Sequence, residues 1–145
     1  AGERQELVIK SKAGFERALE IFPENAAAAY KLGLIQSITG DTASSIGLYR
    51  LAISNKPDDV FSLVNLASIY SRRGQTDSAL YFLNCSFKAD SLNEMTLANL
   101  MGIHYSRGED AEVIRFGEIA VRNGRANDRI SNLLQQSRGR ISRPD

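Results

Sequence analysis

Apolar residues recur at helical spacing through most of the chain, and residues 60–73 show the pattern most clearly. One face of a helix there would carry Val60, Leu63, Leu66, Ala67 and Tyr70. The pattern stops at Gly74, and a glycine suits the left-handed turn that commonly ends a helix. A second apolar face begins at Ala79, and no run alternates with period two over enough residues for a strand. The sequence therefore predicts a series of short helices.

The whole pattern repeats every 34 residues. We call positions one repeat unit apart a column. Identical or similar residues fill four columns: Leu32, Leu66 and Leu100; Ile35, Ile69 and Ile103; Gly40, Gly74 and Gly108; and the small residues Ala18, Ala52, Ser86 and Ala120. Each period contains two helical patterns, so the unit is a helix pair. Because one pair leaves an apolar face bare, the units must stack on one another.

This pattern resembles the tetratricopeptide repeat family, whose unit is about 34 residues long and places small and bulky residues at set positions. The first full unit carries the matching residues Leu32, Gly33, Tyr49, Ala52 and Pro57. The resemblance implies an all-α fold, a right-handed α-solenoid of antiparallel helix pairs. It would contain about 3.5 repeats and a C-terminal capping helix.

The resemblance also implies a division of the chain into one repeat domain, residues 1–138, and a flexible basic tail, residues 139–145. Its parts are the second helix of a partial repeat at 5–22, full repeats at 26–59, 60–93 and 94–127, and a capping helix at 128–138. The third full repeat departs most from the pattern. Met101 replaces a small residue there and Gly117 replaces a bulky one, so we expect its helices to pack differently.

Composition and charge narrow the range of functions that the protein can have. The 145 residues include 18 Lys and Arg against 17 Asp and Glu, which gives no electrostatic reason to expect nucleic acid or an anionic membrane as partner. The single cysteine, Cys85, and the single histidine, His104, cannot build a zinc site or a disulfide. We expect both to pack within helices, and we expect no enzyme activity, no metal and no cofactor. The sequence shows no membrane-spanning stretch or signal peptide, and it leaves the cellular compartment open.

In the tetratricopeptide repeat family, the first helix of each pair lines a concave groove. The resemblance implies a groove surface here that is mostly apolar and aromatic, with a few amides. Its residues would be Tyr30, Lys31, Leu34, Phe61, Val64, Asn65, Ser68, Arg72, Met95, Asn99 and Tyr105. Such a surface suits a peptide with apolar anchors. We therefore expect a non-catalytic scaffold that binds a peptide or protein segment.

Asn65 and Asn99 share one column of this groove. An asparagine amide both donates and accepts, so the two could pair with the backbone of a bound peptide, as in the asparagine ladders of some family members. The alternative is that both are simply solvated. Another binding mode of the family clamps a C-terminal carboxylate, but its cation positions hold Tyr30, Met95 and Asn99 here. We therefore expect apolar and backbone recognition instead of a carboxylate clamp.

The sequence is also compatible with a second function. Residues 5–22 match the second helix of a pair, which we expect to leave an exposed edge, and residues 26–29 are a run of alanines that another helix could approach closely. The alternative function is therefore a structural or self-assembly module, packed against its parent chain or against another copy.

Overall fold

Residues 2–143, which this computed structural model describes, form eight helices and no strand. The helices are α1 (Gly2–Ile21), α2 (Ala26–Ile38), α3 (Thr42–Asn55), α4 (Val60–Arg72), α5 (Thr76–Ala89), α6 (Glu94–Ser106), α7 (Asp110–Arg122) and α8 (Asp128–Ile141). The all-α solenoid that the repeat period predicts is confirmed. Within the described range, no helix combines the length and the apolar character needed to cross a bilayer.

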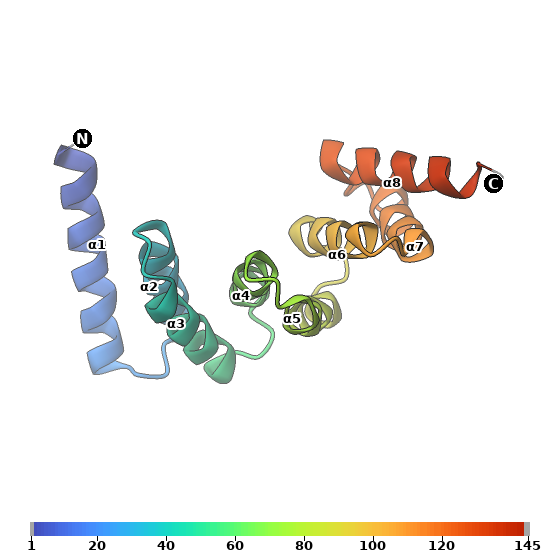
Figure 1. The fold of residues 1–145 in the computed structure, drawn as a ribbon. Coiled ribbons are helices and arrows are strands. Elements are labelled where there is room, and N and C mark those ends of the chain that lie inside the picture. Colours follow the sequence, from blue (N-terminus) through green and yellow to red (C-terminus); the bar gives the residue numbers. More distant parts are fainter. Residues whose placement is uncertain (1, 144–145) are drawn as a thin grey trace.

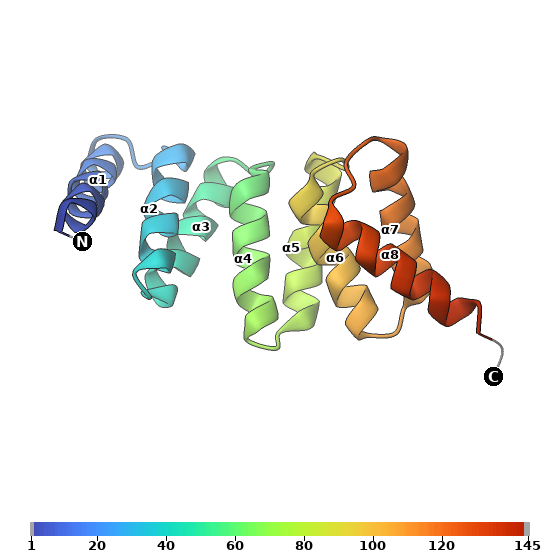
Figure 2. The same ribbon diagram turned by 90° about the horizontal axis from the view of Figure 1, so that it is seen from above.

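The helices are stacked in chain order along an arc (Figure 1). Three pairs, α2 with α3, α4 with α5 and α6 with α7, form the body of the arc, and α1 and α8 cover its two ends. Figure 2, seen from above, shows α2, α4 and α6 following one another along one side, with α3, α5 and α7 behind them. The first helix of every pair thus lies on the inner, concave side of the arc.

Short polar side chains set where the helices begin. The residue before each of five helices accepts a hydrogen bond from the backbone N–H three residues later, at 3.0–3.1 Å: Asn25, Asp41, Asp59, Asn93 and Asn127. Turns between the helices of a pair contain Gly40, Gly74 and Gly108, whose φ angles of 90°, 73° and 72° strongly favour glycine. The identical glycine column therefore reflects one turn repeated three times.

The C-terminal boundary differs from the sequence prediction. Helix α8 continues to Ile141, so residues 139–141 are helical and were wrongly assigned to the tail. Contacts with α6 and α7 support these last turns: Arg138 pairs with Glu118 at 3.2 Å, and Arg140 donates to the carbonyl of Tyr105 at 3.3 Å. Residues 144–145 of the predicted tail, and Ala1, lie outside the described residues.

The two helices of a pair approach closely where a small residue faces a large one. In the first pair, a Cβ added to Gly33 of α2 would lie only 2.9 Å from the ring atom Cε1 of Tyr49 on α3. Tyr49 is 1% exposed, so its ring fills the space that a side chain at Gly33 would need. In the second pair the same two columns hold Ala67 and Leu83, both 1% exposed.

The third pair reverses this arrangement. Met101 on α6 and Gly117 on α7 occupy the same two columns, and a Cβ added to Gly117 would lie 3.0 Å from Met101 Cε and 3.0 Å from Leu134 Cδ1. Met101 is fully buried. The large side chain thus comes from the first helix instead of the second, which explains why both residues depart from the repeat pattern.

The close contact predicts opposite effects for one substitution at two glycines. Gly33→Ala should lower the free energy of unfolding by about 1 kcal/mol or more, because overpacking against the Tyr49 ring outweighs the gain in helix propensity. Gly47→Ala, on the same helix pair, should raise it by up to about 1 kcal/mol, because nothing lies within 4 Å of the added carbon. Urea denaturation of both variants measures the difference, and equal stabilisation by both would contradict the packing described.

Two adjacent interfaces between pairs differ in one buried hydrogen bond. Ser86 on α5 and Thr96 on α6 join their hydroxyls at 2.7 Å in a fully buried position. One repeat unit earlier the same columns hold Ala52 and Ser62. The Ser62 hydroxyl is buried and has no hydrogen-bond partner among the described residues, because alanine stands where the partner serine would be.

This difference predicts unequal costs for two serine-to-alanine substitutions. Ser86→Ala should lower the free energy of unfolding by about 1 kcal/mol, since a satisfied buried bond is lost. Ser62→Ala should be neutral or stabilising, since it removes an unpaired polar group from the interior. Thermal denaturation followed by circular dichroism tests the ranking, and a larger loss for Ser62→Ala would show it to be wrong.

Candidate functional site

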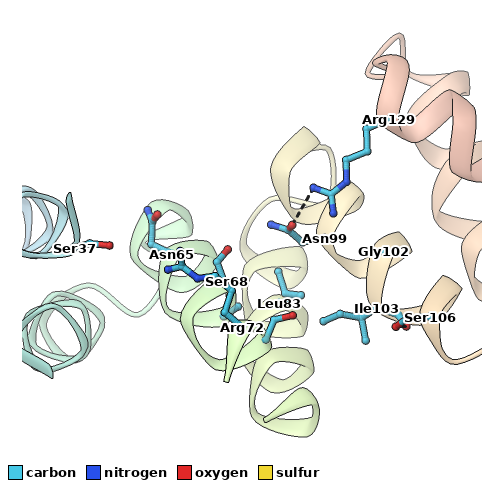
Figure 3. A pocket seen from close by; sticks show the side chains of 12 residues that line it. Ser37, Asn65, Ser68, Arg72, Leu83, Asn99, Gly102, Ile103, Ser106 and Arg129 are labelled. Atoms are coloured by element: carbon cyan, nitrogen blue, oxygen red, sulfur yellow. Dashed lines mark hydrogen bonds between the residues drawn. The ribbon is translucent and has the colours of Figure 1, made fainter. Parts of the chain in front are cut away.

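The concave side of the arc contains a pocket of about 500 Å³ (Figure 3). Helices α2, α4 and α6 supply its walls, Leu83 of α5 contributes from between two of them, and the first turn of α8 closes one side. The twelve lining residues are Ser37, Asn65, Ala67, Ser68, Ser71, Arg72, Leu83, Asn99, Gly102, Ile103, Ser106 and Arg129.

Four of the groove residues expected from the sequence line this pocket: Asn65, Ser68, Arg72 and Asn99. Asn65 donates one amide N–H to the carbonyl of Phe61 at 2.8 Å, and Ser68 donates its hydroxyl to the carbonyl of Val64 at 2.9 Å. Both bonds stay within α4. They fix the two side chains.

Asn99 meets a residue from the C-terminal helix. Its side-chain oxygen accepts a hydrogen bond from Arg129 Nη1 at 3.4 Å, which Figure 3 shows as the dashed line. Arg129 Nη2 also lies 2.9 Å from the point where a Cβ on Gly102 would be. The absence of a side chain at Gly102 therefore gives the guanidinium room to lie against α6.

An aromatic cluster lies outside the pocket where α2 meets α4. The ring of Tyr30 lies 6.2 Å from that of Tyr49 and 5.9 Å from that of Phe61, and Phe61 is 54% exposed. Burial raises the pKa of Tyr30, the charge of Asp59 raises it further, and a hydrogen bond with Asn65 lowers it. Burial also raises the pKa of Tyr49 to about 12. Both phenols are therefore neutral at physiological pH.

The other expected groove residues are dispersed. Val64 is 1% exposed and belongs to the core, and Leu34 is half-buried. Lys31 lies over the ring of Phe15 on α1, with its nitrogen 5.6 Å from the ring centre. The Tyr105 ring is covered by the guanidinium of Arg140 at 3.7 Å, and Met95 is 49% exposed away from the pocket. The structure does not gather these residues into one continuous apolar groove.

The charge of the pocket is positive. Its lining, all within the described residues, contains two guanidinium groups, Arg72 and Arg129, and no carboxylate. Arg129 is absent from the groove expected from the sequence, because residues 128–138 are predicted there only as a polar capping helix. The position of Arg129 in the first turn of α8 was the available signal for its role in the pocket. A side chain in that turn lies beside α6, which is the first helix of the preceding pair.

His104 is not a candidate for chemistry on this geometry. Its ring stacks on Phe116 with centroids 5.7 Å apart, and its Nδ1 lies 2.5 Å from a carboxylate oxygen of Glu109. The histidine side chain is 15% exposed, so it packs between helices, and the sequence analysis overlooked its carboxylate partner. Cys85 is half-buried on α5.

Comparison with known proteins supports the repeat assignment. Residues 48–81 match the family model of the tetratricopeptide repeat, and this segment runs from within α3 into α5. The matched segment is one period long, and its frame is shifted by part of a repeat from the helix pairs described above. No curated protein matches the chain in sequence.

Solved structures with the same fold are distant in sequence. A tetratricopeptide repeat protein from Parabacteroides merdae is 19% identical, with a TM-score of 0.79 over 94% of this chain and 56% of that one. A MamA protein is 16% identical, with a TM-score of 0.71 over 96% of this chain and 81% of that one. A variant of the O-GlcNAc transferase from Thermobaculum terrenum is 20% identical, with a TM-score of 0.66 over 77% of this chain and 22% of that one. At these identities the likeness concerns the fold alone.

Proposed function

Since residues 48–81 match the tetratricopeptide repeat and the chain has the fold of such repeats, we propose that it is a non-catalytic scaffold that holds an extended segment of a partner protein against the concave side of α2, α4 and α6. Proteins of this architecture use their curved inner surface for binding. Residues with the chemistry to bind a polypeptide lie on that side here, and His104 and Cys85 lie elsewhere on packed helices.

One observation carries the proposal. Asn65 and Asn99, which share a column on neighbouring first helices, line the same pocket. Each amide has hydrogen-bonding capacity beyond its contacts within the described residues, because Asn65 contacts the Phe61 carbonyl and the Tyr30 phenol and Asn99 uses only its oxygen. Two amides on adjacent helices can pair with successive N–H and C=O groups of an extended backbone.

Apolar contacts would come from the aromatic cluster. Phe61 presents a large exposed ring at the border of the pocket, beside the half-buried Tyr30. An aromatic anchor of this kind gains affinity by burying apolar area, and its packing against Tyr30 limits its freedom before binding. The bound segment would therefore place an apolar side chain near α2 and its backbone along α4 and α6.

The proposal predicts that the double substitution Phe61→Ala with Asn65→Ala weakens binding. The test uses peptides selected from a random library displayed on phage against the wild-type protein. We expect Kd to rise by about tenfold or more, because the variant loses an aromatic anchor and a hydrogen bond.

The matched control is Tyr81→Ala with Asn84→Ala. These residues are also exposed, and they lie on α5, outside the lining of the concave pocket. They should leave Kd unchanged. Equal effects of the two double substitutions, or a failure to select any peptide, would exclude the groove as the binding site.

A specific feature favours the second candidate function, self-assembly through α1. This helix has no buried residue. Leu7, Gly14 and Ile21 follow one another every seven residues and share one face, on which Leu7 is 64% and Ile21 is 53% exposed. Phe22, just after the helix, is 65% exposed. An apolar face of this kind would be buried by the equivalent face of another copy.

This candidate predicts that molar mass rises with protein concentration in multi-angle light scattering. Leu7→Gln with Ile21→Gln should keep the protein monomeric, because polar side chains remove the gain from burying that face. Leu51→Gln with Val121→Gln is the control, since both residues are exposed on other helices. A wild-type protein that is monomeric at every concentration would rule this candidate out.

A further inference from the structure

We propose that Arg72 and Arg129 make the concave pocket selective for acidic side chains of the segment it holds. This inference rests on the proposed function and names the chemistry of the partner. It also changes the expectation from the sequence, which is that the groove recognises only apolar groups and the backbone of its partner.

The two arginines of the pocket have N–H groups that no described residue occupies. Among the described residues outside the pocket, some arginines lie within 3.4 Å of a carboxylate oxygen and others, such as Arg73 and Arg122, do not. Those with a carboxylate partner are Arg17, Arg107, Arg115, Arg138 and Arg140. Arg72 forms no hydrogen bond or ion pair within the described part of the chain, and Arg129 forms a single long one to the neutral oxygen of Asn99. Most of their N–H donors are therefore available to a ligand.

The composition of the pocket favours an acidic partner. No carboxylate lines it among the described residues, so nothing within its walls neutralises the two guanidinium groups. A bound segment displaces water from them. An apolar side chain over a guanidinium would leave that charge desolvated and unpaired, which is costly, whereas a carboxylate would form charge-assisted hydrogen bonds. The lining thus favours acidic side chains and disfavours apolar ones at these two points.

Helix α6 provides space for Arg129 at Gly102. The column of Gly102 holds Leu34 in the first unit and Ser68 in the second. A side chain at Gly102 would collide with the guanidinium at 2.9 Å, so glycine allows Arg129 to reach past the edge of α8 to Asn99 (Figure 3). Gly102 is therefore a positioning residue, and Arg129 is placed beside one of the amides proposed to hold the backbone.

The position of Arg72 indicates that the pocket recognises acidic side chains within a segment and not the carboxylate at the end of a chain. Arg72 is the last residue of α4, roughly 10 Å along the helix axis from Asn65. Arg129 lies at the other amide, Asn99, on the far side of the pocket in Figure 3. A backbone that follows the two amides can direct separate acidic side chains to the two arginines, which a single terminal carboxylate cannot do.

The experiment uses a random peptide library fused at the amino end of a phage coat protein, so that no displayed peptide has a free C-terminus. Peptides selected on the wild-type protein should be enriched in Asp and Glu relative to the input library. Replacing the acidic residue of a selected synthetic peptide by its amide should raise Kd about tenfold. Arg72→Gln with Arg129→Gln should cause a similar rise for the acidic peptide and little change for the amide form.

Two sets of variants serve as controls. Arg73→Gln with Arg122→Gln removes exposed arginines from α4's end and from α7, outside the pocket, and should leave Kd and acid enrichment unchanged. Gly102→Ala keeps both arginines but displaces Arg129 from α6, and should reduce the preference for the acidic peptide over its amide form. Circular dichroism of each variant confirms that the helices are intact.

The outcomes separate this inference from the proposed function. Selected peptides that need Asn65 for binding but are not enriched in Asp and Glu would overturn this inference and leave the proposed function standing. A selected peptide that binds at least about tenfold more tightly with a free C-terminal carboxylate than as its C-terminal amide, and whose affinity ignores its acidic side chain, would overturn the inference in favour of a chain-end site. Peptides whose binding ignores both Asn65 and the two arginines, or the absence of any selected peptide, would overturn the proposed function together with this inference.

Discussion

The close approach of the two helices in each pair is the constraint on which the rest of the structure depends. Two helices can pack at short distance only where the side chains between them sum to the right volume. Gly33 with Tyr49 and Met101 with Gly117 meet this condition in opposite ways. Because the condition concerns the sum, either helix of a pair can supply the large residue.

The pair geometry in turn creates the concave surface. When similar pairs are stacked, all first helices lie on the inner side of the arc and all second helices on the outer side (Figure 1). Columns on the first helices therefore become rows across the groove, which is how Asn65 and Asn99 reach one pocket. The capping helix α8 has two effects at the end of this surface: Ile130 and Leu134 cover the core, and Arg129 extends the pocket lining with a positive charge.

Much of the fold could be predicted because the repeat is a local pattern reinforced by its copies. Helix periodicity, the glycine column and the polar caps each depend on residues a few positions apart, and the same signals recur in every unit. The end of α8 could not be predicted in this way. Its last turns are supported by contacts of Arg138 and Arg140 with α6 and α7, and these contacts join residues twenty or more positions apart.

The candidate site shows the same division between local pattern and tertiary contact. The stack of helix pairs, the groove-facing side of each first helix and the shared column of Asn65 and Asn99 follow from residue spacing, so the sequence predicts them. The burial of Val64, the cover of Arg140 over Tyr105 and the entry of Arg129 into the pocket over Gly102 arise from contacts between distant residues. The physical reason is that exposure and charge at a surface depend on which distant side chains reach it, and a repeat pattern fixes the backbone without fixing those long side chains.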